Sequence, residues 1–369
     1  MASLSDHLTP HASVTFTSST YQRPIIGRPA TVVTVLHRLT GTSVVFFVPM
    51  DLSLLPEEVL VNVLRQTSPT TVIAAKRLNK KLHRIVERNH LAKPRVDEFN
   101  VEMRTFHERT RPIGRLQSKN VGTGTLHRRV VVTMKRKNKR RQVVQEGVEG
   151  PSNLTGTQLI GEEMRKVLLY GRLSFDGVTA DTEFLNMLTA KWNDLRCIHS
   201  LSFTLCRLKI TEEQLLSLLT RSSCNSLTLD FCHFEHDIVS DKVIAAIPQL
   251  RTLRVQPRSS VFLRNLTNVT LRNWTSKPPS TIALYNCVTN ITVHGICDLI
   301  KTLSLDAVVD WDFGRVLPSE GSDSQLFSMM SIFGLTILIS DDFRSRRVQI
   351  ARGCSRIAFN LIKEESFTS

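Results

Sequence analysis

An apolar frame recurs through the middle of the chain at nearly constant spacing. It appears in YGRLSFDGV (170–178), IHSLSFTLCRL (198–208), CNSLTLDFCHF (224–234) and LRTLRV (250–255). Successive frames start 28, 26 and 26 residues apart, counted from Leu173, Leu201, Leu227 and Leu253. Segments with helical spacing lie between them, at 182–192, 211–219 and 240–247. A unit this short cannot bury its own apolar face, so the pattern predicts strand–helix units stacked against one another.

A strand followed by a helix every 20–29 residues, with Cys or Asn after the strand, resembles a leucine-rich repeat. Cys206 and Cys232 occupy that position, where a small polar side chain can hydrogen-bond the backbone that turns off the strand. We therefore interpret both as structural cysteines rather than metal or redox groups. The exposed positions between core residues would face a protein ligand on the concave strand surface. The candidate substrate-binding residues are Ser202, Thr228 and Arg254.

Beyond residue 255 the frame continues at a shorter interval. Four strand-like strings lie 7–15 residues apart, counted from their first residues, at 266–274, 281–287, 288–296 and 300–308. Such spacing leaves no room for a helix, so we expect strands joined by loops. The last stretches, 326–340 and 346–353, are expected to end the array with a helix and strands, because terminal repeats are atypical.

Residues 51–92 have a different character. Apolar residues recur at helical spacing, and there is no Gly. Pro56 suits the first turn of a helix, where the following Glu57 and Glu58 favour the positive helix end. The pair Ser68-Pro69 predicts a break, after which a second and a third helix follow.

The segment LSLLPEEVLVNVLRQTSPTTVIAAKRLNKKLHRIV (52–86) resembles an F-box. Leu55-Pro56-Glu57 matches the family's opening, Ser68-Pro69 its central break, and Lys80-Lys81-Leu82 its closing basic and bulky residues. Leu82 stands where the family often has Trp or Phe, and Asn79 where it often has Cys or Ser. The layout of an F-box, a β-rich spacer and degenerate leucine-rich repeats is similar to the expanded nematode F-box families.

The resemblance implies docking onto the Skp-type adaptor of a cullin–RING ubiquitin ligase, with a protein substrate held by the C-terminal domain. A three-helix unit of about 40 residues buries little surface by itself. A partner's helices could complete its apolar face. The candidate adaptor-binding residues are Leu54, Leu55, Pro56, Val59, Leu60, Val63 and Leu64, of which about half are expected to pack inside the F-box itself.

The net charge of +15 comes from one segment. Residues 76–141 hold 21 Lys and Arg against 5 Asp and Glu, an excess of 16, and the rest of the chain is nearly neutral. Its densest part is KRKNKRR (135–141), which two Val-rich runs flank, so we predict a hairpin with Asn138 near its tip. Three interpretations stay open: an import signal, a site for nucleic acid or acidic substrates, and a solvated hairpin tip. The basic patch comprises Lys135, Arg136, Lys137, Lys139, Arg140 and Arg141.

Several classes of protein do not fit the sequence. The N-terminus has no signal-peptide pattern, and the apolar stretch 30–49 is too interrupted for a membrane span. Seven Cys without a CxxC pair argue against a disulfide framework and a zinc ribbon. No phosphate loop or hydrolase motif is present, and His233 and His236 lack a second ligand pair at zinc spacing. We expect no cofactor, no metal and no catalytic residue in an intracellular protein of the cytoplasm, the nucleus or both.

The sequence predicts an α+β multidomain chain. A disordered Ser/Thr-rich arm (1–48) with one short strand precedes a three-helix F-box (49–92), a basic β-rich spacer (93–150) and a leucine-rich-repeat-like α/β solenoid (151–369) that becomes strands and loops near its end. The predicted function is a non-catalytic substrate receptor of a Skp–cullin–F-box ubiquitin ligase. One alternative is a protein that binds nucleic acid or an anionic surface through 104–141, and another is a scaffold that has lost its adaptor.

Overall fold

The computed structural model describes residues 32–36, 45–49, 55–107, 126–148, 154–191, 197–304, 307–317, 321, 324, 326–328, 335–341 and 345–362. The chain divides into two compact units, Met1–Ala92 and Lys93–Ser369, which have separate hydrophobic cores. Among the helices described, none is long and apolar enough to cross a membrane.

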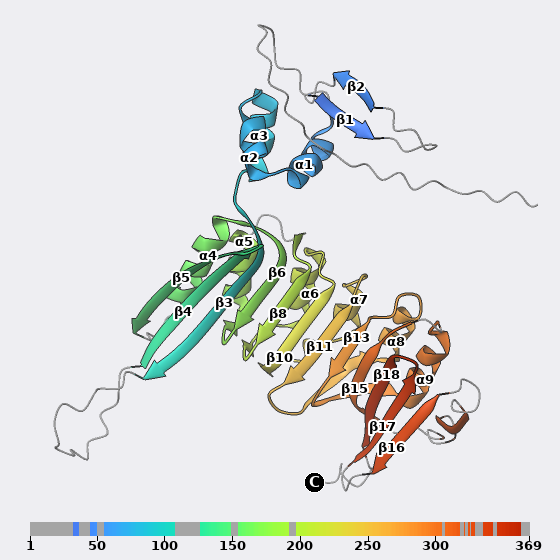
Figure 1. The fold of residues 1–369 in the computed structure, drawn as a ribbon. Helices are drawn as coiled ribbons and strands as arrows, with labels where there is room; N and C mark the ends of the chain where they lie inside the picture. The colour runs from blue at the N-terminus through green and yellow to red at the C-terminus, as the bar shows by residue number, and fades with distance from the viewer. Residues whose placement is uncertain are drawn as a thin grey trace, which may run out of the picture. The chain divides into compact units, whose positions relative to one another are not determined.

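The first unit contains a β-hairpin and three helices (Figure 1). Strands β1 (Val32–Leu36) and β2 (Val45–Pro49) pair in antiparallel fashion, so the segment predicted to hold one strand contains two; its other residues lie outside the described ranges. The helices are α1 (Glu57–Gln66), α2 (Pro69–Lys76) and α3 (Lys80–Arg88).

Two side chains explain where α2 and α3 begin. The Ser68 hydroxyl accepts a hydrogen bond from the Thr71 N–H at 3.1 Å, and Pro69 occupies the first position of α2. The Asn79 Oδ1 accepts from the Leu82 N–H at 2.7 Å and so begins α3. Asn79 is therefore a helix cap, and Leu82 is buried in the core.

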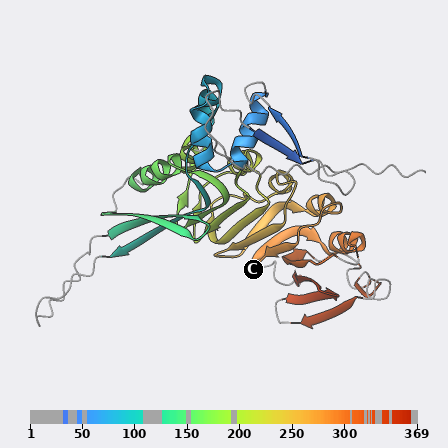
Figure 2. The same ribbon diagram turned by 45° about the horizontal axis from the view of Figure 1, so that its top comes forward.

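The second unit is a 16-stranded sheet with helices along one face (Figures 1 and 2). Its central strands are parallel to one another, and an antiparallel meander closes each end. In spatial order the strands are β16 (Thr336–Asp341), β17 (Ser345–Arg352), β18 (Ser355–Ile362), β15 (Asp310–Leu317), β13 (Thr281–Leu284), β11 (Thr252–Pro257), β10 (Ser226–Phe234), β8 (Ser200–Thr204), β6 (Leu168–Asp176), β3 (Arg95–His107), β4 (Leu126–Arg136) and β5 (Lys139–Val148). Short strands complete the sheet at one edge of the parallel strands, namely β7 (Thr179–Ala180), β9 (Arg207–Leu208), β12 (Val261–Thr267) and β14 (Cys287–Thr292).

The helices that cover this sheet are α4 (Leu154–Arg165), α5 (Thr182–Lys191), α6 (Glu212–Thr220), α7 (Asp241–Ala245), α8 (Asn268–Trp274) and α9 (Val293–Thr302). The sequence predicts α5, α6 and α7 close to these bounds. Between the helices and the sheet, the alternating apolar residues of each strand form one continuous core. One lateral row of this core runs through Phe99, Leu173, Leu201, Leu227, Leu253, Ile282, Trp311 and Ile357.

The region after residue 255 differs from its prediction, because it keeps helices. Strand cores there lie 29 residues apart, from Leu253 to Ile282 and from Ile282 to Trp311. The string 266–274, rich in β-formers, is mostly helix α8, because the Thr267 hydroxyl caps it by accepting from the Val269 N–H at 3.1 Å. Thr292 caps α9 in the same way. Local capping and packing therefore override strand propensity at these positions.

The described strands of the basic segment 93–150 belong to the same sheet as the strands that follow them. Strand β3 pairs in parallel with β6, so Phe99 lies beside Leu173 in the shared core. Strands β4 and β5 form an antiparallel hairpin whose last pair is Arg136 with Lys139. The segment treated as a spacer is thus an end of the sheet within the unit Lys93–Ser369.

Candidate functional site

The residues proposed to bind an adaptor divide into buried and exposed groups. Leu60 and Leu64 are 1% and 5% exposed and form part of the first unit's core. Leu55 is half-buried against that core, and its carbonyl accepts a hydrogen bond from Lys81 Nζ at 3.0 Å. Val63 is half-buried as well, and Leu54 lies outside the described residues. Leu60 and Leu64 therefore position the helices, and their contact with a partner stays a prediction.

Among the described residues of the first unit, three large apolar side chains and one proline are exposed. Pro56 and Val59, both predicted contacts, are exposed at the start of α1. Ile73 on α2 and Leu78 before α3 are 41% and 51% exposed, although their helical spacing suggested core positions. Such exposed apolar side chains are available to a partner. Helical spacing in the sequence could not identify Ile73 and Leu78 as exposed. Ile73 follows the buried Val72, and Leu78 precedes the helix cap Asn79.

A shallow basic hollow lies where α2 meets α3. It is lined by Lys76, Arg77, Asn79, Lys80, His83 and Arg84. Lys76 hydrogen-bonds Glu87, and this contact lowers the pKa of the Glu87 carboxyl. The remaining cationic side chains give the surface of the first unit a positive character.

A comparison with known families agrees with the resemblance seen in the sequence. Residues 52–93 match the family model of the F-box domain. The matched range covers α1, α2 and α3, together with the buried Leu91 after them. F-box domains bind Skp-type adaptors of ubiquitin ligases, and F-box proteins are typically non-catalytic subunits of those ligases. No curated protein matches the chain.

The three predicted substrate-binding residues lie in one row across the sheet of the second unit. Ser202 on β8 is beside Thr228 on β10, which is beside Arg254 on β11. All three are half-buried on the face opposite the helices, because alternate residues of each strand enter the core. Arg254 Nε donates to Asp230 at 2.7 Å, and its guanidinium lies 5.9 Å from the centre of the Tyr285 ring.

Hydroxyl side chains dominate the middle of this polar face. They occupy neighbouring positions on five adjacent strands, and each is half-buried. Within the described part of the chain, none of these hydroxyl groups has a hydrogen-bond partner. A hydroxyl both donates and accepts, so the track can bind the amide groups of a polypeptide. Its members are Ser174, Ser200, Ser202, Thr204, Ser226, Thr228, Thr252 and Thr281.

Ion pairs border the hydroxyl track on the β3 side. Arg104 bonds Glu102 at 2.8 Å and Asp176 at 3.2 Å. Burial raises the pKa of the Asp176 carboxyl, although Arg104 opposes the shift. Four residues before Glu102 on β3, Glu98 accepts a hydrogen bond from Lys135 at 2.8 Å, and this contact lowers the pKa of the Glu98 carboxyl.

Carboxylates on β3 and α4 partly neutralise the basic run of the hairpin formed by β4 and β5. Besides Lys135, Arg141 is paired, with the buried carboxylate of Glu163 at 3.3 Å. The other four cations, Arg136, Lys137, Lys139 and Arg140, are exposed without an ion-pair partner among the described residues. The turn places Lys137 rather than Asn138 in the left-handed region, at φ 50°, and the Lys137 N–H donates to Asp97 at 2.7 Å.

The cysteines after the strands have the structural role predicted for Cys206 and Cys232. Each thiol donates a hydrogen bond to a main-chain carbonyl of the neighbouring parallel strand that comes earlier in the chain. The acceptor is the second core residue of that strand, such as Phe203 on β8 for Cys232 on β10. Cys287 repeats the arrangement, and burial raises the pKa of its thiol to about 12. The sulfur-to-oxygen distances are 3.4 Å for Cys206, 3.4 Å for Cys232 and 3.7 Å for Cys287.

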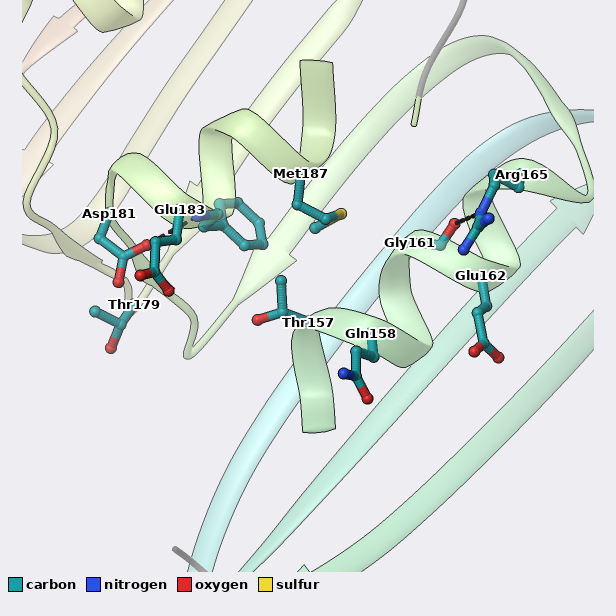
Figure 3. A pocket seen from close by; sticks show the side chains of 10 residues that line it. Thr157, Gln158, Gly161, Glu162, Arg165, Thr179, Asp181, Glu183 and Met187 are labelled. Carbon is teal, nitrogen blue, oxygen red and sulfur yellow. Dashed lines mark hydrogen bonds between the residues drawn. The ribbon is translucent and has the colours of Figure 1, made fainter. Parts of the chain in front are cut away.

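A hollow of about 280 Å³ lies between α4 and α5 (Figure 3). Met187 lines it on the α5 side, and Arg165 on the α4 side donates to the Gly161 carbonyl at 3.4 Å. The charged residues at its rim, Glu162, Arg165 and Glu183, are exposed. The hollow is therefore a solvated groove between neighbouring helices.

Proposed function

We propose that this protein is a non-catalytic substrate receptor of a Skp–cullin–F-box ubiquitin ligase. The observation that carries the proposal is the F-box match at residues 52–93 on a small three-helix unit. That unit keeps only nine apolar residues in its described core and leaves Val59, Ile73 and Leu78 exposed. Apolar surface on so small a core supports completion by a partner's helices.

The second unit is proposed to hold the substrate on the polar face of its sheet, as a solenoid similar to leucine-rich repeats would. The unpartnered hydroxyl track, with Ser202, Thr228 and Arg254 in one row, supports a polypeptide ligand. We expect the complex to work inside the cell, in the cytoplasm, the nucleus or both. Ubiquitin transfer would take place on other subunits.

The adaptor is tested by co-purification of the full chain with a Skp-type adaptor and a cullin. Val59→Asp on α1 is expected to abolish adaptor binding, because it places a charge on an apolar contact surface. Val269→Asp on α8 is a matched control, since the two valines are 43% and 42% exposed near a helix start. Adaptor binding by the Val59→Asp variant would show that Val59 is not part of the contact. Failure of the wild-type chain to bind would refute the ligase function and favour a scaffold.

The double change Leu55→Ala with Pro56→Ala is a less direct probe of the contact, since Leu55 also packs on the core of the first unit. Its effect on adaptor binding must be compared with its effect on helix content, measured by circular dichroism. Lost binding with intact helices supports a direct contact at the start of α1.

An alternative function is favoured by the four unpaired cations of the hairpin. Arg136, Lys137, Lys139 and Arg140 form an exposed cluster that could bind nucleic acid or an anionic surface. Replacing the basic residues of 135–141 with Gln should then remove a salt-sensitive affinity for a DNA or RNA duplex and leave adaptor binding intact. Unchanged affinity, or affinity that does not depend on salt, would exclude this function.

A further inference from the structure

A left-handed residue recurs at or near the end of four parallel strands of the second unit, each time one residue before a buried side chain. The turn residues have φ values of 69° at Gly177, 53° at Leu205, 52° at Phe231 and 57° at Asn286. Glycine and asparagine adopt this conformation readily, whereas a bulky side chain brings its Cβ close to a carbonyl oxygen. The repeat therefore accommodates Gly and Asn at two of these turns and holds a strained residue at the other two.

The two strained residues are neighbours, and both are apolar and exposed. Leu205 directly follows β8, and Phe231 lies in the adjacent strand β10. The Leu205 N–H donates to the Asp230 carbonyl at 2.9 Å. Their exposed fractions are 51% and 45%. Neither fills the core, so packing inside the fold does not explain why a bulky residue is kept in a strained turn. Strain held at an exposed apolar position points to contact with another molecule.

The row immediately before this pair is polar and slightly acidic. It runs from Glu102 through Asp176 and Thr204 to Asp230, on four adjacent strands. Among the described residues, only two guanidinium groups, those of Arg104 and Arg254, pair with its three carboxylates.

The row on the other side of the pair carries Arg207 on β9, between Thr179 and His233. Glu235 pairs both Arg207, at 2.8 Å, and Lys209, at 3.6 Å. The unbalanced carboxylate nearest the apolar pair therefore lies in the row from Glu102 to Asp230.

We propose that Leu205 and Phe231 are the apolar anchors of the substrate-binding surface. The class of ligand is a polypeptide segment that places large apolar side chains on this pair and a lysine or arginine toward the Glu102–Asp176–Asp230 row. This inference rests on the proposed substrate-receptor function and names the chemistry of its substrate. The hydroxyl track begins in the same lateral row and supplies hydrogen bonds to the segment's main chain.

The test uses the double variant Leu205→Asn with Phe231→Asn, which copies the residue found at the equivalent Asn286. We expect its urea midpoint, followed by tryptophan fluorescence, to lie at or above that of the wild type, because strain is relieved. A lower midpoint would show that the apolar side chains serve the fold, and would overturn the proposal. Asn286→Leu is the matched control for the turn, and it should lower the midpoint by introducing the same strain.

Ligand binding is measured with the full chain on an array of synthetic peptides of about twelve residues, long enough when extended to cross the pair. Each peptide has a Ser/Gly background and two leucines, with Lys or Glu scanned through the other positions. We expect binding that needs both leucines, is stronger with Lys than with Glu, and falls about tenfold in the double Asn variant. Asn286→Leu should leave this binding unchanged.

Three results would overturn the proposal: no leucine-dependent peptide binding, a preference for Glu, or undiminished binding by the double Asn variant. None of these readouts involves the adaptor. A wild-type chain that binds the peptides but no adaptor would therefore refute the ligase function and leave the polypeptide site in place. A chain that binds the adaptor but none of the peptides would refute the polypeptide site and leave the ligase function in place.

Discussion

Gly171→Ala is expected to separate the basic end of the second unit from the rest of its sheet. Gly171 lies on β6, opposite a register shift in β3, and a Cβ built there would stand 2.3 Å from the Asp97 carbonyl oxygen. An ordinary contact between these atoms is about 1 Å longer, and the obstacle is main chain rather than a side chain that can rotate. The two strands must move apart, which disturbs the pairing of Phe99 with Leu173 in the core.

The cost follows from this geometry. Overpacking by one methyl group in a well-packed region typically destabilises a fold by about 1–3 kcal/mol. Because the clash at Gly171 is with backbone, we expect the upper end of that range. With a urea m-value of about 3 kcal/mol/M for a unit of this size, the unfolding midpoint should fall by about 1 M.

Tryptophan fluorescence during urea unfolding is the assay. All three Trp residues follow position 93, so the signal reports the second unit alone. Gly147→Ala on β5 is the matched control, since a Cβ there meets nothing within 4 Å. It should leave the midpoint unchanged or raise it slightly, by about 0.4–1 kcal/mol of stability. Equal midpoints for Gly171→Ala and the wild type, or an equal loss in both variants, would refute the close-approach argument.

Three further outcomes are expected. Iodoacetamide at about pH 8 should modify the exposed Cys354 quickly and the buried Cys287 only after unfolding, because burial raises the pKa of Cys287 to about 12 and keeps it as a thiol; mass spectrometry of digests would show the order. Leu60→Ala should cost the first unit about 2–5 kcal/mol, since Leu60 is 1% exposed, and hydrogen exchange should then show α1 to α3 unprotected; retained protection would place Leu60 outside the core. Lys135 lowers the pKa of Glu98 in the native state. Their ion pair should therefore stabilise the native state at pH values above 4.5, the ordinary pKa of Glu, and this stabilisation should be lost as the pH falls through the lower pKa of the native state. Both side chains are about one-third to one-half exposed, so Glu98→Gln should cost only about 0.2–1 kcal/mol, and a stability gap to wild type that persists at about pH 2 would contradict the assignment.

Helix positions in the first unit could be predicted well from the sequence, because period, cap and breaker residues are local signals. Ser68-Pro69 both ends one helix and begins the next. The division of its apolar residues into core and surface could not be predicted, since Val59 and Leu60 are neighbours on one helix yet are 43% and 1% exposed. That division depends on where the other two helices pack.

The strand positions up to residue 255 could also be predicted, since apolar and polar residues alternate in β8, β10 and β11. Strands β15 and β18 were not predicted. The row of Ser202, Thr228 and Arg254 follows from that alternation once the strands are paired in register. Their part in substrate binding stays a prediction. The helices after residue 255 were not predicted, because threonine has a high strand propensity. Only the folded structure shows that Thr267 and Thr292 cap α8 and α9.

The sequence by itself determined the spacing of the repeats up to residue 255, which residues of those repeat strands enter the core, and the helical unit that resembles an F-box. Each of these follows from the spacing of apolar residues close together in the sequence. Only the tertiary structure decided that the basic segment joins the same sheet, which carboxylates neutralise its charge, and that Leu205 and Phe231 occupy left-handed turns side by side. The reason is physical: strand register, ion pairing and the sign of φ are set by residues distant in sequence, which local pattern does not record.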